Sequence, residues 1–237
     1  NFWLSLGLSF FMLLYTLILA EIQADRWSDY YGVKNATVCS LHNIEQTIPA
    51  ILLDPLWNLL GLNKVKMTPA AFKDKLGVFG EPTTLGVLLG LIIGILGNLK
   101  DLGTIQAWGQ ILQFSIQLAA VMTIFPLVTG VFAKAFTPLA EEIDKNRKQE
   151  SQAEGKEIDK INDKKRWFLA VDDGVGYGEP ATIIAGVILI PIMVLIAFLL
   201  PGNKTLPIVD LISLPFMVES IVAITRGNIL KVIANGI

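Results

Sequence analysis

The sequence predicts an all-α integral membrane protein with polytopic helices, and three observations support this class. Hydrophobic residues make up 53% of the 237 residues, charged residues make up only 17%, and the mean hydropathy is +0.57. Soluble domains usually carry about 25% charged residues. Several apolar runs approach the roughly 17–25 residues that cross a bilayer as a helix. These runs do not alternate every second residue, as the strands of a membrane barrel would.

The apolar runs place the spans, and the turns between them carry the charged residues. We expect spans at 2–20, 82–97, 104–136 and 181–200, and a span or hairpin at 208–225. The chain starts without Met and ends within an apolar segment, so we expect it to be part of one longer transmembrane domain.

Residues 35–61 are long enough to span but differ in character. His42, Glu45 and Gln46 fall near the middle, and Pro49 and Pro55 interrupt the run. A helix facing lipid should not carry such a polar cluster. Broken backbone is tolerated at membrane depth where it is buried in protein or lines a cavity. The sequence therefore predicts a re-entrant hairpin over 35–61.

Two patterns point to helix–helix packing. Gly86, Gly90 and Gly94 are spaced by four, so they share one face of the 82–97 helix, and such a face lets another helix approach closely. The next span carries a stripe of four glutamines, for which we weigh interhelical hydrogen bonding against a polar lining of a substrate path: Gln106, Gln110, Gln113 and Gln117.

The charged segments predict topology and exclude several functions. Lys and Arg concentrate in 62–76, 141–166 and 226–231, whereas the turns near 100 and 203 carry one Lys each. The basic segments are therefore expected on the cytoplasmic side, with 141–166 as a polar cytoplasmic loop. Acids and bases are mixed there, so nucleic acid is not expected as a partner. One cysteine provides no disulfide framework and no Cys-rich metal site, and we expect no metal and no cofactor.

Ionisable groups within membrane segments are costly and often mark a substrate route. Each candidate also has a structural reading: a satisfied core histidine for His42, a helix cap for Glu81, and loop caps for the aspartates. We interpret Glu219 as structural, paired with Arg226. The candidate substrate-binding residues are His42, Glu45, Gln46, Glu81, Asp172, Asp173 and Asp210.

Three segments resemble the galactitol permeases of the bacterial phosphotransferase system, the membrane IIC subunits. GVFGEPTTLGVLLGLIIGIL (77–96) is similar to that family's G-x-F-G-E-P-x-T-x-G followed by G-L-I-I-G-I-L. LIPIMVLIAFLLPGNKTLPIVDL and the later RGNIL, both within 188–230, resemble its I-P-x-x-x-L-I-A-x-x-x-P-G-N-x-x-L-P-x-x-D-L and Q-G-N-L. SLHNIEQTIPA (40–50) lies where the family has a P-H-G element. The sequence departs from the pattern at Leu41, at the second Gly-Glu-Pro (178–180) and in the length of 141–166.

The resemblance implies a homodimer in the membrane lipid, with a static scaffold and a moving core that carries the sugar by an elevator-type shift. It implies uptake of a galactitol-like sugar alcohol, phosphorylated by a cytoplasmic IIB subunit supplied by IIA. The chain itself would be the translocation subunit and not an enzyme. Cys39 lies in a hydrophobic segment without a basic loop to lower its pKa, so the phosphocysteine is expected on the partner.

Two other functions were weighed against this one. An ion-coupled secondary transporter of a small polar solute would need no phosphoryl partner. An integral membrane enzyme acting on lipids would want clustered acids at helical spacing, and the adjacent Asp172 and Asp173 point to different helix faces.

Overall fold

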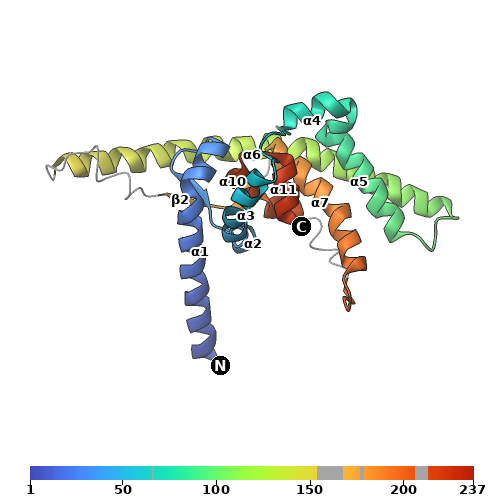
Figure 1. The fold of residues 1–237 in the computed structure, drawn as a ribbon, viewed down its shortest axis with the longest axis horizontal. Helices are drawn as coiled ribbons and strands as arrows, with labels where there is room; N and C mark the ends of the chain where they lie inside the picture. The colour runs from blue at the N-terminus through green and yellow to red at the C-terminus, as the bar shows by residue number, and fades with distance from the viewer. Residues whose placement is uncertain (66, 154–167, 177–178, 206–212) are drawn as a thin grey trace.

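The structure is a computed structural model that describes residues 1–65, 67–153, 168–176, 179–205 and 213–237. In this part of the chain, helices dominate and two short strands form a small sheet (Figure 1). Three helical segments are long and apolar enough to cross a membrane: Phe2–Tyr31, Ile105–Ile124 and Pro180–Leu199. A shorter apolar helix covers Thr83–Gly97. The integral membrane class is confirmed, with more irregular structure between the helices than a simple bundle has.

Helix α1 (Phe2–Tyr31) runs without a break through the predicted 2–20 span and the charged segment after it. It ends at Gly32, whose φ of 71° lies in the left-handed region that favours glycine. The helix continues past residue 20 because its charged residues lie on an exposed face, whereas Gln23, Ala24 and Trp27 are buried. Its first half exposes large apolar side chains, as a lipid-facing helix does.

The 35–61 segment contains strand β1 (Ala36–Val38) and helices α2 (Leu41–Ile44) and α3 (Thr47–Leu59). It leaves the C-terminal end of α1, runs back alongside that helix, and returns toward the same end (Figure 1). This path is compatible with the predicted re-entrant hairpin, which stays a prediction. Strand β1 pairs in parallel with β2 (Leu169–Val171), with Ala36 opposite Leu169. The all-α prediction missed this sheet because three-residue strands are too short to show alternation.

Helix α4 (Pro69–Leu76), the 3₁₀ turn η1 (Gly77–Gly80) and helix α5 (Pro82–Gly97) follow. The Thr68 hydroxyl accepts a hydrogen bond from the backbone N–H of Ala71, so the threonine caps α4. Helix α5 matches the predicted 82–97 span. Its glycine face meets α6 directly, because a Cβ on Gly90 would lie 2.4 Å from the Cα of Ser115. The glycine face is therefore a helix contact, as predicted.

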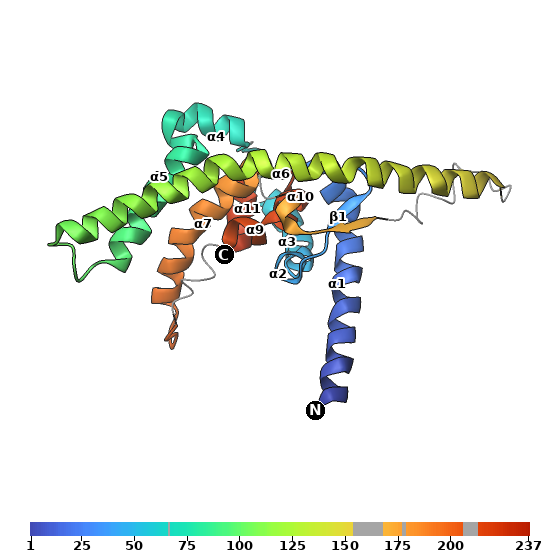
Figure 2. The ribbon, with the colours of Figure 1, turned by 180° about the vertical axis from the view of Figure 1, so that it is seen from behind.

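Helix α6 (Ile105–Ala153) is 49 residues long and crosses one side of the molecule, in front of the other elements in Figure 2. The prediction placed a span at 104–136 and a polar loop at 141–166. The helix instead continues through the first part of that polar segment, and residues 154–166 lie outside the described residues. Mixed charges favour this continuation, since an exposed helix needs no apolar face and gains from pairs such as Lys145 with Glu142.

The C-terminal part builds the centre of the molecule. The 3₁₀ turn η3 (Asp173–Val175) precedes α7 (Pro180–Leu199), and α9 (Leu214–Met217), α10 (Glu219–Thr225) and α11 (Ile229–Gly236) pack beside it. Described residues 213–225 form two short helices and not one span. Their apolar core joins α7, α10 and α11: Ala181, Ile184, Ala185, Leu189, Val218, Ile221, Val222, Ile229 and Val232.

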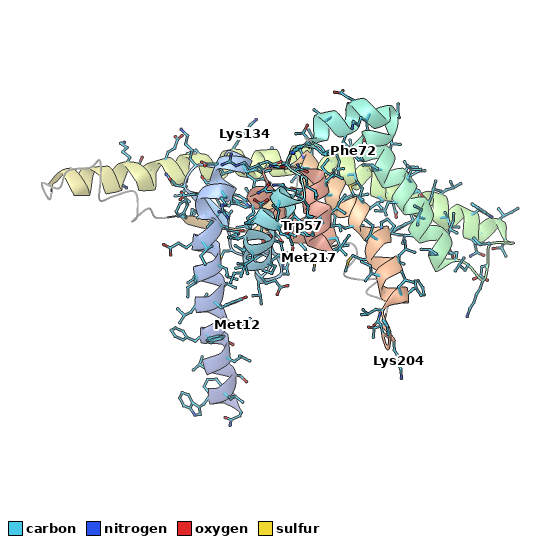
Figure 3. The ribbon with its side chains drawn as sticks, viewed as in Figure 1. Met12, Trp57, Phe72, Lys134, Lys204 and Met217 are labelled. Carbon is cyan, nitrogen blue, oxygen red and sulfur yellow. The ribbon has the colours of Figure 1, made fainter. Side chains whose placement is uncertain are left out.

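The two ends of the molecule differ in the segments they hold. Lys134 and Phe72 lie at one end and Lys204 lies at the other (Figure 3). The N-terminus and the α5–α6 turn point toward the Lys204 end, whereas α4 and the charged half of α6 lie at the opposite end (Figure 1). Helix α4 and the described charged part of α6, which belong to two of the segments predicted to be cytoplasmic, thus lie toward one end, and their side of the membrane stays a prediction.

Candidate functional site

The polar site forms where the two strands end. Parallel strands deliver their C-terminal ends to the same edge of a sheet. Chain leaving β1 reaches Ser40 and His42, and chain leaving β2 reaches Asp172 and Asp173. His42 Nε2 and Asp173 Oδ2 are paired, and the Ser40 hydroxyl donates to Asp172 Oδ1 at 3.1 Å. The structure therefore brings together three of the predicted site residues, from segments far apart in the sequence.

The two carboxyls of this site have different environments. The Asp173 side chain is only 10% exposed, whereas that of His42 is 47% exposed. Burial, followed by the neighbouring Asp172 carboxyl, raises the pKa of Asp173. A hydrogen bond with the Asp173 side chain, followed by the bond from Ser40, lowers the pKa of Asp172. Asp173 therefore releases its proton less readily than Asp172, and the exposed Asp172 carboxyl offers acceptor oxygens at the surface of the site.

Asn43, next to His42, fixes α2 against the α9–α10 junction. Its side-chain N–H donates to the Phe216 carbonyl at 2.7 Å. Its Oδ1 accepts from the backbone N–H and the hydroxyl of Ser220, at 2.9 and 2.7 Å. Asn43 and Ser220 are both fully buried. This amide was not predicted as important, and it holds the loop that carries His42.

Glu219 lies fully buried beneath the site. Its Oε2 accepts from Trp27 Nε1 at 3.3 Å, and its carboxylate packs so closely on Gly176 that a Cβ there would lie 2.5 Å from Oε2. The predicted pairing with Arg226 is wrong. Arg226 is exposed at the opposite end of α10, about two helix turns from Glu219. Sequence reasoning paired two charges that lie at opposite ends of one helix.

The second Gly-Glu-Pro joins the same network. Glu179 caps α7 by accepting from the Thr182 N–H at 2.8 Å and from its hydroxyl at 3.0 Å. The Tyr30 hydroxyl donates to the other Glu179 oxygen at 2.8 Å, and the Tyr31 hydroxyl shares a 2.8 Å hydrogen bond with Thr182. These contacts connect α1 to the start of α7.

Three predicted residues lie apart from the His42–Asp173 pair. Glu45 is exposed and Gln46 half-buried, and both line a separate pocket of about 250 Å³ beside α7, α9 and α11. Glu81 forms a surface ion pair with Lys73 at 2.9 Å. Its side chain does not cap α5, in contrast to the predicted helix-cap reading. Asp210 lies outside the described residues.

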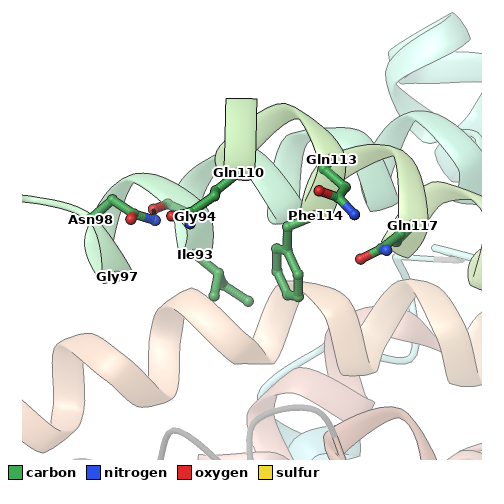
Figure 4. Close-up of a pocket in the computed structure, with 8 residues that line it drawn as sticks. All are labelled: Ile93, Gly94, Gly97, Asn98, Gln110, Gln113, Phe114 and Gln117. Carbon is green, nitrogen blue, oxygen red and sulfur yellow. Dashed lines mark hydrogen bonds between the residues drawn. The ribbon is translucent and has the colours of Figure 1, made fainter. Parts of the chain in front are cut away.

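The glutamine stripe is exposed along α6. Gln110, Gln113 and Gln117 line an open pocket of about 370 Å³ together with Asn98 and the glycine end of α5 (Figure 4). The expected interhelical hydrogen bonds of these amides are not found among the described residues. No group of three potential metal ligands occurs in the described part of the chain either.

Sequence reasoning missed most of the supporting residues. The predicted site residues do not include Trp27, Gln23, Asn43 or Thr182. Gln23 Oε1 accepts from the Thr47 hydroxyl at 2.9 Å, which is a buried contact between α1 and the start of α3. The available signal was a spacing of seven and four that places three buried residues on one face of α1: Thr16, Gln23 and Trp27.

These features define a multi-pass membrane protein whose polar site is built from short, broken elements between its spanning helices. The chain belongs to the family of sugar-specific permease components of the phosphotransferase system, whose model matches residues 1–237. It is 32% identical over 189 residues to the galactitol-specific EIIC components of Escherichia coli strains K12 and O157:H7. Each match covers 79% of this chain and 38% of the relative. The chain thus spans about two fifths of the length of these curated relatives. No solved structure matches.

Proposed function

We propose that the chain forms part of the translocation unit of a phosphotransferase-system permease for a galactitol-like sugar alcohol. Cytoplasmic IIB and IIA subunits supply the phosphoryl group, and the permease works as a homodimer. The observation that carries the proposal is the polar site at the ends of β1 and β2. It combines the half-exposed imidazole of His42 with the exposed carboxylate of Asp172, in a chain with the composition of an integral membrane protein.

This donor set suits a polyol. Each hydroxyl of a sugar alcohol both donates and accepts a hydrogen bond. Asp172 offers acceptor oxygens, and His42 offers its second ring nitrogen because Nε2 is already held by Asp173. Ser40 and Asn43 position the two segments. The parallel pairing of β1 with β2 supports the proposed re-entrant, elevator-type core, in which the 35–61 hairpin moves with its substrate.

The proposal is tested by uptake of labelled galactitol into cells or vesicles with the full-length permease. Uptake should require IIB and phosphoenolpyruvate. His42→Ala and Asp172→Asn should each weaken binding of galactitol by about tenfold or more. The first variant removes a hydrogen bond between the imidazole and a ligand hydroxyl, and the second replaces a charged acceptor of such a bond by a neutral one.

Asp101→Asn provides a matched control, because it removes a carboxylate from the exposed α5–α6 turn. It should leave uptake unchanged. Uptake driven by a proton or sodium gradient without IIB would instead support the ion-coupled alternative. Unchanged galactitol binding in both site variants would remove the β1–β2 edge as the binding site.

A further inference from the structure

A second polar cavity, of about 420 Å³, lies between α1, α3, α10 and α11. It is distinct from the His42 site, since none of its lining residues belongs to that site. Three cationic side chains and one carboxylate line it: Arg26, Arg226, Lys231 and Asp54. The cavity therefore carries an excess of two positive charges. Its volume falls in the range of small-molecule pockets.

Lys231 forms the base of this cavity. The residue is 7% exposed, and its Nζ donates to Asp54 Oδ1 at 2.8 Å and to Asn58 Oδ1 at 2.6 Å. Asn58 also donates to the other Asp54 oxygen at 3.1 Å. Both carboxylate oxygens are thus engaged by neighbours. A lysine ammonium has three donors, so one remains for a ligand.

The two arginines supply the charge that is not neutralised. Arg26 on α1 and Arg226 after α10 are both exposed, and in the described ranges neither guanidinium has an ion-pair partner. They converge on the cavity from different elements. Each guanidinium presents several donors in a plane that matches the oxygens of phosphate.

The backbone at Arg226 is a second, independent observation. Its φ of 54° and ψ of 44° place it in the left-handed region, which costs free energy for an arginine and little for a glycine. Such strain at a non-glycine residue is typical of functional sites. The conformation ends α10 and turns the chain, so that residue 226 lies at the cavity between Thr225 and the start of α11.

We propose that this cavity binds a phosphate monoester, with Arg26 and Arg226 contacting its oxygens and Lys231 donating from below. The inference rests on the proposed function, which places phosphoryl transfer at the end of the molecule that holds the basic segments. The cavity lies at that end, at the C-terminal ends of α1 and α10. The monoester is either the phosphorylated sugar alcohol or the phosphocysteine of the donor subunit.

The test is titration of the purified full-length permease at low salt with three probes: galactitol phosphate, inorganic phosphate and galactitol. Arg226→Gly should weaken binding of galactitol phosphate by about tenfold or more, because it removes a charge-assisted contact. It should leave galactitol binding unchanged. The variant should unfold at no lower temperature than the parent, since glycine relieves the backbone strain. Arg26→Gln should weaken the phosphate probes in the same way.

Lys100→Gln is the charge-matched control, at the exposed turn after α5, and should bind all probes normally. A second titration, with phosphorylated and unphosphorylated IIB, separates the two sources. If the arginine variants lose binding of galactitol phosphate alone, the cavity binds the phosphorylated product. If they lose binding of phosphorylated IIB alone, the cavity binds the phosphocysteine of the donor subunit. The inference would be overturned if the parent and Arg226→Gly bound every monoester equally. It would also be overturned if the cavity bound only an anionic phospholipid and none of the monoesters. Because these are binding measurements, they stand even if uptake proves independent of IIB.

Discussion

The close contact between the glycine face of α5 and helix α6 predicts that a glycine-to-alanine substitution destabilises the fold inside this contact and not outside it. A Cβ at Gly90 would lie 2.4 Å from the Cα of Ser115, about 1 Å short of ordinary van der Waals contact. The obstacle is backbone, so no side chain can rotate away. Helices α5 and α6 would have to separate, and a gap of 0.5–1 Å forfeits roughly a quarter to a half of each dispersion contact. We expect Gly90→Ala to destabilise the fold by about 2–3 kcal/mol.

Gly109→Ala on α6 is the matched control, since nothing lies within 4 Å of its Cβ position. There alanine should be neutral or stabilise by up to about 1 kcal/mol, the difference in helix propensity. The geometry also ranks the series: Gly86, with Ala119 Cα at 2.8 Å, should lose less than Gly90, and Gly94, at 3.1 Å from an Ile111 side-chain carbon, should lose least.

Thermal unfolding of the permease in detergent measures these differences, at roughly 2–4 °C per kcal/mol for a chain of this size. Gly90→Ala should lower the midpoint by about 4–12 °C on that scale. Equal midpoints for Gly90→Ala and Gly109→Ala would refute the close approach of α5 and α6. A reversed ranking of the three glycines would refute the register of the contact.

Three further predictions concern the polar network. Asn43→Ala strips partners from the Ser220 N–H and the Phe216 carbonyl, so stability should fall by about 2–4 kcal/mol in chemical unfolding; an unchanged midpoint would contradict the anchoring role. Trp27→Phe should destabilise the fold by leaving the buried Glu219 carboxyl without its donor, and adding Glu219→Gln should recover part of the loss; strictly additive effects in the double-mutant cycle would argue against the contact. The raised pKa of Asp173 means that the fold holds its proton more tightly than the unfolded chain does, so this residue's contribution to stability is present below about pH 4 and declines as pH rises through its folded pKa. Asp173→Asn should remove that decline in thermal scans from about pH 4 to pH 7. Parallel pH profiles of parent and variant would show that burial of Asp173 does not make the stability depend on pH.

The helices and their glycine contact could be predicted from the sequence because they follow from local patterns. Apolar length located α5 and α7 to within a residue or two, and a spacing of four identified the face that meets α6. The Thr68 cap of α4 is equally local, since a threonine directly before a proline favours the start of a helix. Each of these depends on residues within a few positions of one another.

The candidate site was predicted only in its ionisable residues. His42, Asp172 and Asp173 were identified as costly polar groups in apolar surroundings, but their meeting depends on β1 and β2, which lie far apart in the chain and are too short to leave a pattern. Glu219 shows the same limit: its nearest opposite charge in sequence is Arg226, yet its partner is Trp27 on α1. Long-range pairing is set by packing, and one sequence does not display it.

The β1–β2 pair also sets the unit of movement. Three backbone pairings, extended by the hydrogen bonds from Cys39 N–H to Val171 and from Leu169 N–H to Asn35, connect the two loops that carry His42 and Asp173. These bonds are made by backbone groups, so among single substitutions only proline, which removes the N–H donor, would release one. Any rearrangement that carries one half of the site must carry the other half with it. In the proposed elevator-type core, the boundary between the static and the moving part would therefore run around the strand pair, with the flexible joints elsewhere, such as at the Gly32 turn after α1.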